Sequence, residues 1–270
     1  MNSPNPPSTL STLSSFSLRL FSILLLAGWV LPLLPARAAD ESPDPKTFPP
    51  PRRALVPKLH GPVTIDGNLN EPVWTNAAVL SPFSQNDGSG SEREKTTVRI
   101  WYDDTALYLG WTCVDSDIQA TFTARDSKFW EEEVVEFFVT PEKLDRYFEL
   151  QWNPLGGVFD AIIDNKVDQH GVSTNFTGDW SFTAKGMKSG VKVRGTVGKS
   201  DDKDEMWQVE VMLPFADLGE RSPKSKAIWR ANFYRFNRAK EHPEELLSWS
   251  PTRLPGFHQP ARFGYLEFGE

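Results

Sequence analysis

The feature that most constrains the fold is a succession of short β-branched and aromatic runs from residue 96 to the end of the chain. TTVRIWYDD (96–104) and ALYLGWTCVD (106–115) flank a short polar turn, which is typical of a β-hairpin. In RYFELQW (146–152), Tyr147, Glu149 and Gln151 face one way, and Phe148, Leu150 and Trp152 face the other. The remaining strand candidates are EVVEFFVT, GGVFDAIID, WSFTAK, GVKVRGTVG, MWQVEVMLP, AIWRANFYRFN and RFGYLEF.

About ten such runs at regular spacing, with little helix, predict an all-β domain of two antiparallel sheets packed as a β-sandwich. The only convincing helical turn is PFADLG (214–219). Many tryptophans belong to this core, since a tryptophan in an alternating strand buries a large apolar area. We assign Trp111, Trp152 and Trp207 to packing.

The N-terminal residues 1–38 have the pattern of a secretory signal peptide. An apolar run from Leu20 to Leu34 follows Arg19, and Ala36-Arg37-Ala38 forms a small-x-small cleavage site near Ala38. The run contains Pro32 and is shorter than the roughly 20 residues of a membrane-spanning helix. We therefore expect a secreted or periplasmic protein with no stable membrane insertion after cleavage, an uncleaved anchor being the alternative.

Residues 39–57 are rich in proline, with six prolines between residues 41 and 57. This composition predicts a stiff linker of polyproline type. The domain is then expected to span residues 58–270.

Charge and cysteine content exclude several kinds of partner and bond. The formal net charge is −7, and removing residues 1–38, with Arg19, Arg37 and no acid, gives −9. An acidic chain is a poor ligand for nucleic acid or anionic lipid, because both require basic patches. The single cysteine, Cys113, excludes an internal disulfide.

The candidate site begins in FWEEEVVEFFVT (129–140), where Glu136 interrupts an apolar strand. Strand parity puts Trp130 and Glu136 on one face, but a straight strand would separate them by about 20 Å. They can meet one ligand only if residues 130–133 curl back as a loop, and the acidic cluster there disfavours a straight buried strand. A tryptophan face beside a carboxylate suits a sugar ring. The alternative is that Glu136 pairs with an interior arginine such as Arg99 or Arg235.

Catalytic and metal-binding functions have weaker patterns. Glu136, Glu149 and Asp160 lie on three successive predicted strands, so a glycosidase pair of carboxylates is conceivable. The acidic segments 103–117 and 199–205 supply oxygen ligands for a structural calcium ion, although neither has the spacing of a known loop. The histidines show no zinc-like spacing.

Four segments together resemble carbohydrate-binding modules of family 9. VTIDGNLNEPVWTNA (63–77) is similar to the opening of that family, and TVRIWYDDTALYLGWTCVDSDI (97–118) to its central hairpin. FWEEEVVEFFVTP (129–141) and SWSPTRLPGFHQPARFGYLEF (248–268) resemble two later motifs. The likeness covers about residues 58–270, with the motifs in the family's order.

The resemblance implies a DOMON-like, jelly-roll β-sandwich that binds the ends of glucan or xylan chains between two aromatic rings, with structural calcium nearby. Trp130 matches the first ring of the clamp and Glu136 the acid that binds hydroxyls. The second ring falls near Phe257 or His258, where sugar-binding members have tryptophan. Glu149 stands about where those members have an arginine, for which Arg146, Arg253 or Arg262 is a candidate replacement.

The leading prediction is therefore a secreted carbohydrate-binding module, accessory to the breakdown of xylan- or cellulose-like polysaccharides. Its predicted site residues are Trp130, Glu136, Glu149, Phe257 and His258. One alternative is a glycoside hydrolase. The other is a haem-binding, electron-transfer domain of the DOMON type, in which Met212 is the candidate axial ligand.

Overall fold

The computed structural model describes residues 44–141 and 143–270. The predicted signal peptide (1–38) and the start of the predicted linker lie outside the described residues. The part of the chain that is described contains fourteen strands and five 3₁₀ turns, so it is all-β as expected.

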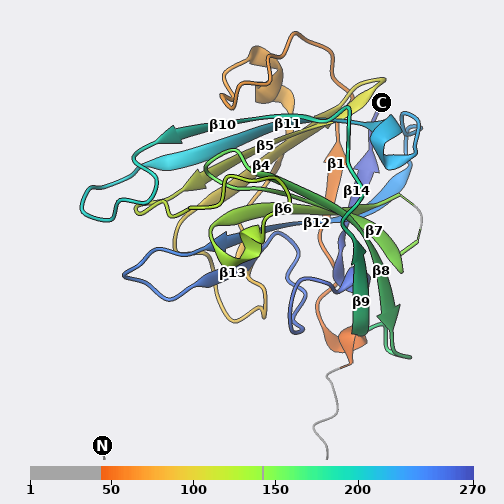
Figure 1. Cartoon of the computed structure of the whole chain (residues 1–270). Helices are drawn as coiled ribbons and strands as arrows, with labels where there is room; N and C mark the ends of the chain where they lie inside the picture. The colour runs from red at the N-terminus through yellow and green to blue at the C-terminus, as the bar shows by residue number, and fades with distance from the viewer. Residues whose placement is uncertain (1–43, 142) are drawn as a thin grey trace, which may run out of the picture. The chain divides into compact units, whose positions relative to one another are not determined.

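The strands form two sheets that lie as two layers (Figure 1). The larger sheet has the order β1–β14–β12–β6–β7–β8–β9, and β13 joins it beside β12, with β3 beside β13. Its strands are β1 (Arg53–Val56), β3 (Ser84–Gln85), β6 (Val134–Thr140), β7 (Arg146–Trp152), β8 (Val158–Val167), β9 (Ser173–Asp179), β12 (Ile228–Asn237), β13 (Glu245–Ser248) and β14 (Gly264–Phe268).

The smaller sheet has the order β10–β11–β5–β4–β2. Its strands are β2 (Ala78–Leu80), β4 (Thr96–Tyr102), β5 (Ala106–Val114), β10 (Lys188–Arg194) and β11 (Met206–Pro214). The predicted hairpin is confirmed as β4 and β5, which pair antiparallel. Within the two sheets the described strand pairs are antiparallel, except that β1 runs parallel to β14.

The main core fills the space between the two sheets. Trp111, Trp152 and Trp207 are fully buried in or beside it, which confirms their assignment to packing. The alternation predicted for β7 is also confirmed: Leu150 and Trp152 face this core, whereas Glu149 faces the other side of the larger sheet. That outer face of the larger sheet carries a second aromatic cluster and the candidate site.

Buried Glu210 explains part of the motif in residues 63–77. Its carboxylate accepts hydrogen bonds from the backbone N–H groups of Asp66 and Gly67 and from the indole N–H of Trp74. Gly67 has a left-handed φ of 90°, and a side chain there would collide with the backbone of β10. The motif therefore holds a loop against the smaller sheet, whereas the candidate site described below lies on the larger sheet.

Several predicted boundaries are wrong. Within the predicted linker, Arg53–Val56 forms β1, and Val56 is fully buried, so this stretch belongs to the fold. WSFTAK (180–185) is not a strand, whereas β9, just before it, was not predicted. The 3₁₀ turn Phe215–Leu218 (η4) is confirmed, and the curl predicted at residues 130–133 begins as the 3₁₀ turn η3 (Phe129–Glu131). Three other turns were not predicted: η1 (Pro45–Thr47), η2 (Pro72–Asn76) and η5 (Pro260–Arg262). Turns this short leave no periodic apolar pattern in the sequence.

Among the described residues, none of the helical segments has the length and apolar character needed to cross a membrane.

Candidate functional site

A cavity of about 440 Å³ lies on the outer face of the larger sheet. Its volume is typical of small-molecule sites, which span about 300–1,000 Å³. The structure brings all five predicted site residues, Trp130, Glu136, Glu149, Phe257 and His258, to this cavity. The other lining residues are Gln151, Phe159, Ile163, Phe176, Trp180, Phe236, Leu246 and Gly256.

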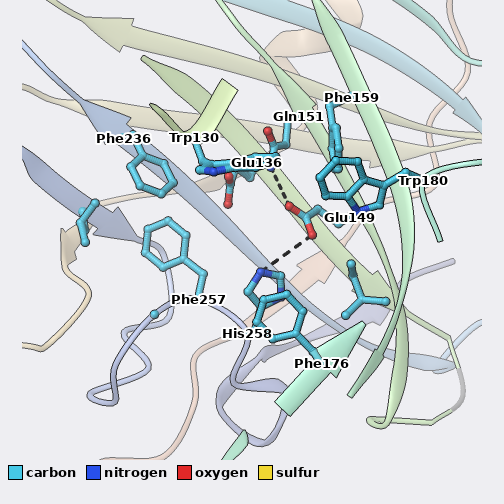
Figure 2. A pocket seen from close by; sticks show the side chains of 13 residues that line it. Trp130, Glu136, Glu149, Gln151, Phe159, Phe176, Trp180, Phe236, Phe257 and His258 are labelled. Carbon is cyan, nitrogen blue, oxygen red and sulfur yellow. Dashed lines mark hydrogen bonds and ion pairs between the residues drawn. The ribbon is translucent and has the colours of Figure 1, made fainter. Parts of the chain in front are cut away.

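Aromatic rings surround the cavity on several sides. Figure 2 shows Phe236 and Phe257 on one side, Phe159 and Trp180 on the opposite side, and His258 with Phe176 below. Most of these rings come from different elements, so the sandwich fold itself brings them together as an aromatic box around the cavity. Such a box can stack on the apolar face of a flat ligand.

Trp130 reaches the cavity because the chain curls before β6. The 3₁₀ turn η3 carries it, with neighbouring Phe129 fully buried as the anchor of the turn. The Glu132 carboxylate accepts hydrogen bonds from the backbone N–H groups of Thr121 and Phe122, which ties the turn to the preceding loop. The predicted curl is therefore confirmed. Of the other glutamates after Trp130, Glu131 pairs with Lys128 on the surface, and buried Glu133 accepts a hydrogen bond from the backbone N–H of Arg238.

Trp180 and Phe176 are site residues that the sequence did not reveal. Phe176 lies on β9 and Trp180 directly follows it, and the two side chains are 43% and 50% exposed. Trp180 contacts Trp130 edge-on, with ring centroids 5.9 Å apart. A side chain at Gly178 would come within 2.4 Å of the Trp180 indole nitrogen, so glycine at this position lets the indole fold back toward the cavity.

Glu136 is a buried carboxyl with no protein partner. It is 2% exposed, lines the cavity, and forms no hydrogen bond or ion pair with another described residue. The proposed pairing with an arginine is wrong for the described residues: buried Arg235 pairs with Asp115 at 2.8 Å instead. Burial, together with the negative charge of Glu149, raises the pKa of Glu136 well above its ordinary value, against an opposing effect of Arg238.

Glu149 lies diagonally opposite Glu136 on the neighbouring strand. In the β6–β7 register, Glu136 faces Gln151 and Phe138 faces Glu149, so the two carboxyls share one face of the sheet. Gln151 donates to Glu149 Oε1 at 2.6 Å, and Glu149 Oε2 lies 4.0 Å from His258 Nε2 (Figure 2). Burial raises the pKa of Glu149 as well.

The loop before η5 supplies Phe257 and His258. The Phe257 ring stacks on Tyr234 at a centroid distance of 4.1 Å, which fixes its orientation. His258 stacks on Phe176 at 3.7 Å, and its Nδ1 lies 2.7 Å from the Tyr147 hydroxyl. Burial lowers the pKa of His258 to about 4, so its imidazole is neutral at pH 7.

The cavity is rich in acceptors and poor in donors. The Glu136 carboxyl lines the cavity and accepts no hydrogen bond from another described residue. Gln151 Oε1 is buried without a partner among the described residues. Buried polar atoms are normally satisfied. A ligand rich in hydroxyl or N–H groups would supply the missing donors.

The other sequence-predicted functional residues lie elsewhere. Asp160 does not line the cavity; it accepts from Arg125 and from the backbone N–H of Ala184. None of the three candidate replacement arginines lines it either, since Arg146 pairs with Asp164, and Arg253 and Arg262 line a separate pocket. Met212, the candidate haem ligand, packs in a cluster on the smaller sheet.

Calcium binding by the acidic segments stays a prediction. Within the described ranges, no group of three or more His, Cys, Asp or Glu side chains could hold a metal ion. Asp103 accepts from the backbone N–H groups of Thr105 and Ala106, and Asp204 accepts from those of Ile118 and Thr196. In this structure these two carboxylates therefore hold turns of the backbone.

Comparison with known families gives one match over most of the chain. The family model described as carbohydrate-binding family 9 matches residues 86–268. No curated protein sequence matches the chain.

Solved structures share the fold at low sequence identity. A Bacteroides uniformis protein assigned to carbohydrate binding is 20% identical, with a TM-score of 0.59 over 81% of this chain and 99% of its own. Two structures of a family 9 module from Caldicellulosiruptor kristjanssonii, each 15% identical, cover 81% of this chain. The one with cellotriose has a TM-score of 0.54 over 94% of its chain, and the one with glucose 0.51 over 97%. At these identities the likeness establishes the fold and not the ligand.

Proposed function

The chain belongs to carbohydrate-binding family 9, and from this premise we propose that its cavity holds the terminal sugar of a polysaccharide chain. The observation that carries the proposal is the Glu136 carboxyl, buried and without a protein partner in an aromatic cavity. A buried polar group that lacks a partner is costly unless a ligand satisfies it. Sugar hydroxyls donate to a carboxylate and satisfy it directly.

The rings complete the recognition of a pyranose. The C–H face of the sugar stacks on an aromatic ring, while the hydroxyls at its edge reach the sheet. Trp130 and Trp180 present the largest rings, and Trp180 is half exposed, so apolar area at the cavity is open to a ligand. Glucan and xylan ends are the first ligands to test, since a solved relative holds cellotriose.

The proposed biological role is that of a secreted accessory module in extracellular polysaccharide breakdown. It rests on the signal-like pattern of residues 1–38 and on the family's common association with polysaccharide hydrolases.

The carboxyl pair favours binding over hydrolysis. A glycosidase needs one carboxyl protonated and the other ionised as nucleophile or base. Here burial raises the pKa of both Glu136 and Glu149, and no arginine or lysine lining the cavity holds either one ionised. Asp160, the third candidate, is engaged outside the cavity.

Trp130→Ala tests the proposal. We expect affinity for a saccharide that binds the wild type to fall at least about 30-fold, because truncating a central aromatic contact typically costs 2 kcal/mol or more. The measurement is titration calorimetry, with thermal unfolding to show that the fold is intact. Leu155→Ala, at an exposed apolar position outside the cavity, is the control and should bind normally. Unchanged affinity in folded Trp130→Ala protein would show that the saccharide does not bind in this cavity.

A further inference from the structure

The cavity contains two carboxyls and no strongly basic side chain. Neither lysine nor arginine is among its lining residues, and His258 is neutral at pH 7 because burial lowers its pKa to about 4. Neighbouring hydroxyls are committed to protein atoms: that of Tyr234 donates to the Phe257 carbonyl, and that of Tyr147 lies 2.7 Å from His258 Nδ1. Any positive charge that balances the pair must therefore come from nearby residues or from the ligand.

The cation that acts on Glu136 from nearby is Arg238, and it is engaged elsewhere. Its guanidinium pairs with Glu244 at 2.8 Å and lies 5.0 Å from the centroid of the Phe236 ring. Arg238 does not line the cavity. It lowers the pKa of Glu136 without overcoming burial and the charge of Glu149.

The aromatic rings add a second attraction for positive charge. The face of an aromatic ring attracts a cation within about 6 Å of its centroid, and tryptophan does so best. Trp130, Trp180 and Phe159 contact one another edge-on at this cavity, with centroid distances of 5.5 to 5.9 Å. Aromatic rings combined with two carboxyls form the kind of site that recognises ammonium groups.

We infer that this cavity selects an amino sugar, a saccharide end that carries a protonated amine, over a neutral sugar of the same shape. The inference rests on the proposed saccharide function. Glu136 and Glu149 are diagonal neighbours on adjacent strands, a spacing at which long side chains can reach one common group. The ammonium group would lie between the two carboxylates while the sugar ring stacks on the aromatic wall.

Binding of the amine is expected to release a carboxyl proton. A protonated carboxyl of the pair releases its proton to solvent as the ammonium ion, which keeps its own protons, forms an ion pair with the resulting carboxylate. Below the raised pKa of the pair, affinity for the amine should therefore rise with pH, by up to tenfold per unit for each proton released. A neutral sugar requires no such release.

The experiment is titration calorimetry of the purified protein at pH 7 with four probes. Three are β-1,4-linked tetrasaccharides that differ at the second carbon: a glucosamine oligomer, its N-acetylated form and cellotetraose. The fourth, choline, is a cation without a sugar ring. We expect the glucosamine oligomer to bind at least tenfold more tightly than each of the other three, with proton release seen as a dependence of the heat on buffer ionisation.

The outcomes separate this inference from the proposed function. Equal affinity for cellotetraose and the glucosamine oligomer would overturn the inference and leave the proposed function standing. If choline binds and none of the three saccharides does, or if none of the four probes binds, both the inference and the proposed function are overturned.

A variant pair locates the effect in the cavity. Glu149→Gln keeps the size of the side chain but removes one carboxyl, and it should reduce the preference for glucosamine over cellotetraose at least fivefold. Glu131→Gln removes one negative charge beside Trp130 but outside the cavity, so the preference should persist. Equal loss in both variants would mean that the net charge of the protein, and not the carboxyl pair, attracts the amine.

Discussion

At the residue scale, Glu136 shows how surroundings set the chemistry of a side chain. Both of its neighbours along β6, Val135 and Phe137, belong to the core between the sheets, while the carboxyl points to the opposite face. Strand parity predicted that Glu136 and Trp130 share a face, but the apolar residues on both sides of Glu136 show no alternation that would identify the face. The sequence could not decide between an arginine partner and a cavity, since Arg235 and Asp115 are 120 positions apart and only folding brings them together.

The raised pKa of Glu136 predicts a pH-dependent cost to stability. An unfolded glutamate ionises near pH 4.3, whereas the folded carboxyl keeps its proton to higher pH. The native state therefore binds more protons above pH 4.3, and stability is lost as pH rises through the folded pKa. We expect Glu136→Gln to gain stability relative to the wild type as pH rises from 5 to 8, because the glutamine does not titrate.

Denaturant unfolding at several pH values measures this difference. Glu131→Gln provides the comparison, because its carboxylate is on the surface. A Glu136→Gln difference that stays constant from pH 5 to pH 8 would show that the carboxyl is ionised in the fold throughout.

At the element scale, β9 and the residue after it complete the cavity wall. The strand reads STNFTGD, and six of its seven residues are exposed, with Phe176 as its one large apolar residue. An exposed edge strand of this kind has no alternating pattern, which is why neither β9 nor the roles of Phe176 and Trp180 could be predicted. By contrast, η3 could be anticipated, because a run of glutamates cannot continue a buried strand.

Gly178→Ala tests the contribution of this element. The new methyl group would lie 2.4 Å from the Trp180 indole nitrogen, so the indole must move away from its present position. We expect saccharide affinity to fall about tenfold, with little change in thermal unfolding. Gly90→Ala, where an added methyl group meets nothing within 4 Å, should leave affinity unchanged. If both variants bind as the wild type does, Trp180 takes no part in recognition.

At the scale of the whole domain, the two-layer sandwich was predictable and its N-terminal boundary was not. Long strands such as β5, β11 and β12 can be predicted from their β-branched and aromatic composition. By contrast, β1 is four residues long and lies between prolines. It pairs in parallel with β14 near the C-terminus (Figure 1). Because these two strands lie at opposite ends of the domain's sequence, no local pattern predicts their pairing.

The placement of β1 predicts that a chain beginning at residue 58 is less stable than one beginning at residue 44. Burying one valine side chain contributes about 1.5–3 kcal/mol, and Val56 is fully buried. For a domain of this size the midpoint of thermal unfolding should fall by about 3–10 °C. As a matched pair of point variants, Val56→Ala should destabilise, whereas Leu55→Ala, at a position 62% exposed, should not. Equal stability of the two truncated chains would make β1 dispensable.

Titration with end-modified ligands measures whether the cavity holds the end of a saccharide chain. Cello-, xylo- and glucosamine oligosaccharides would each be titrated with native ends and after borohydride reduction, which opens the terminal ring. We expect an oligosaccharide that binds with its native end to lose binding on reduction, because an open chain has no ring face to stack between Trp130 and the opposite rings. Equal binding of native and reduced forms, or no binding of any saccharide, would contradict it.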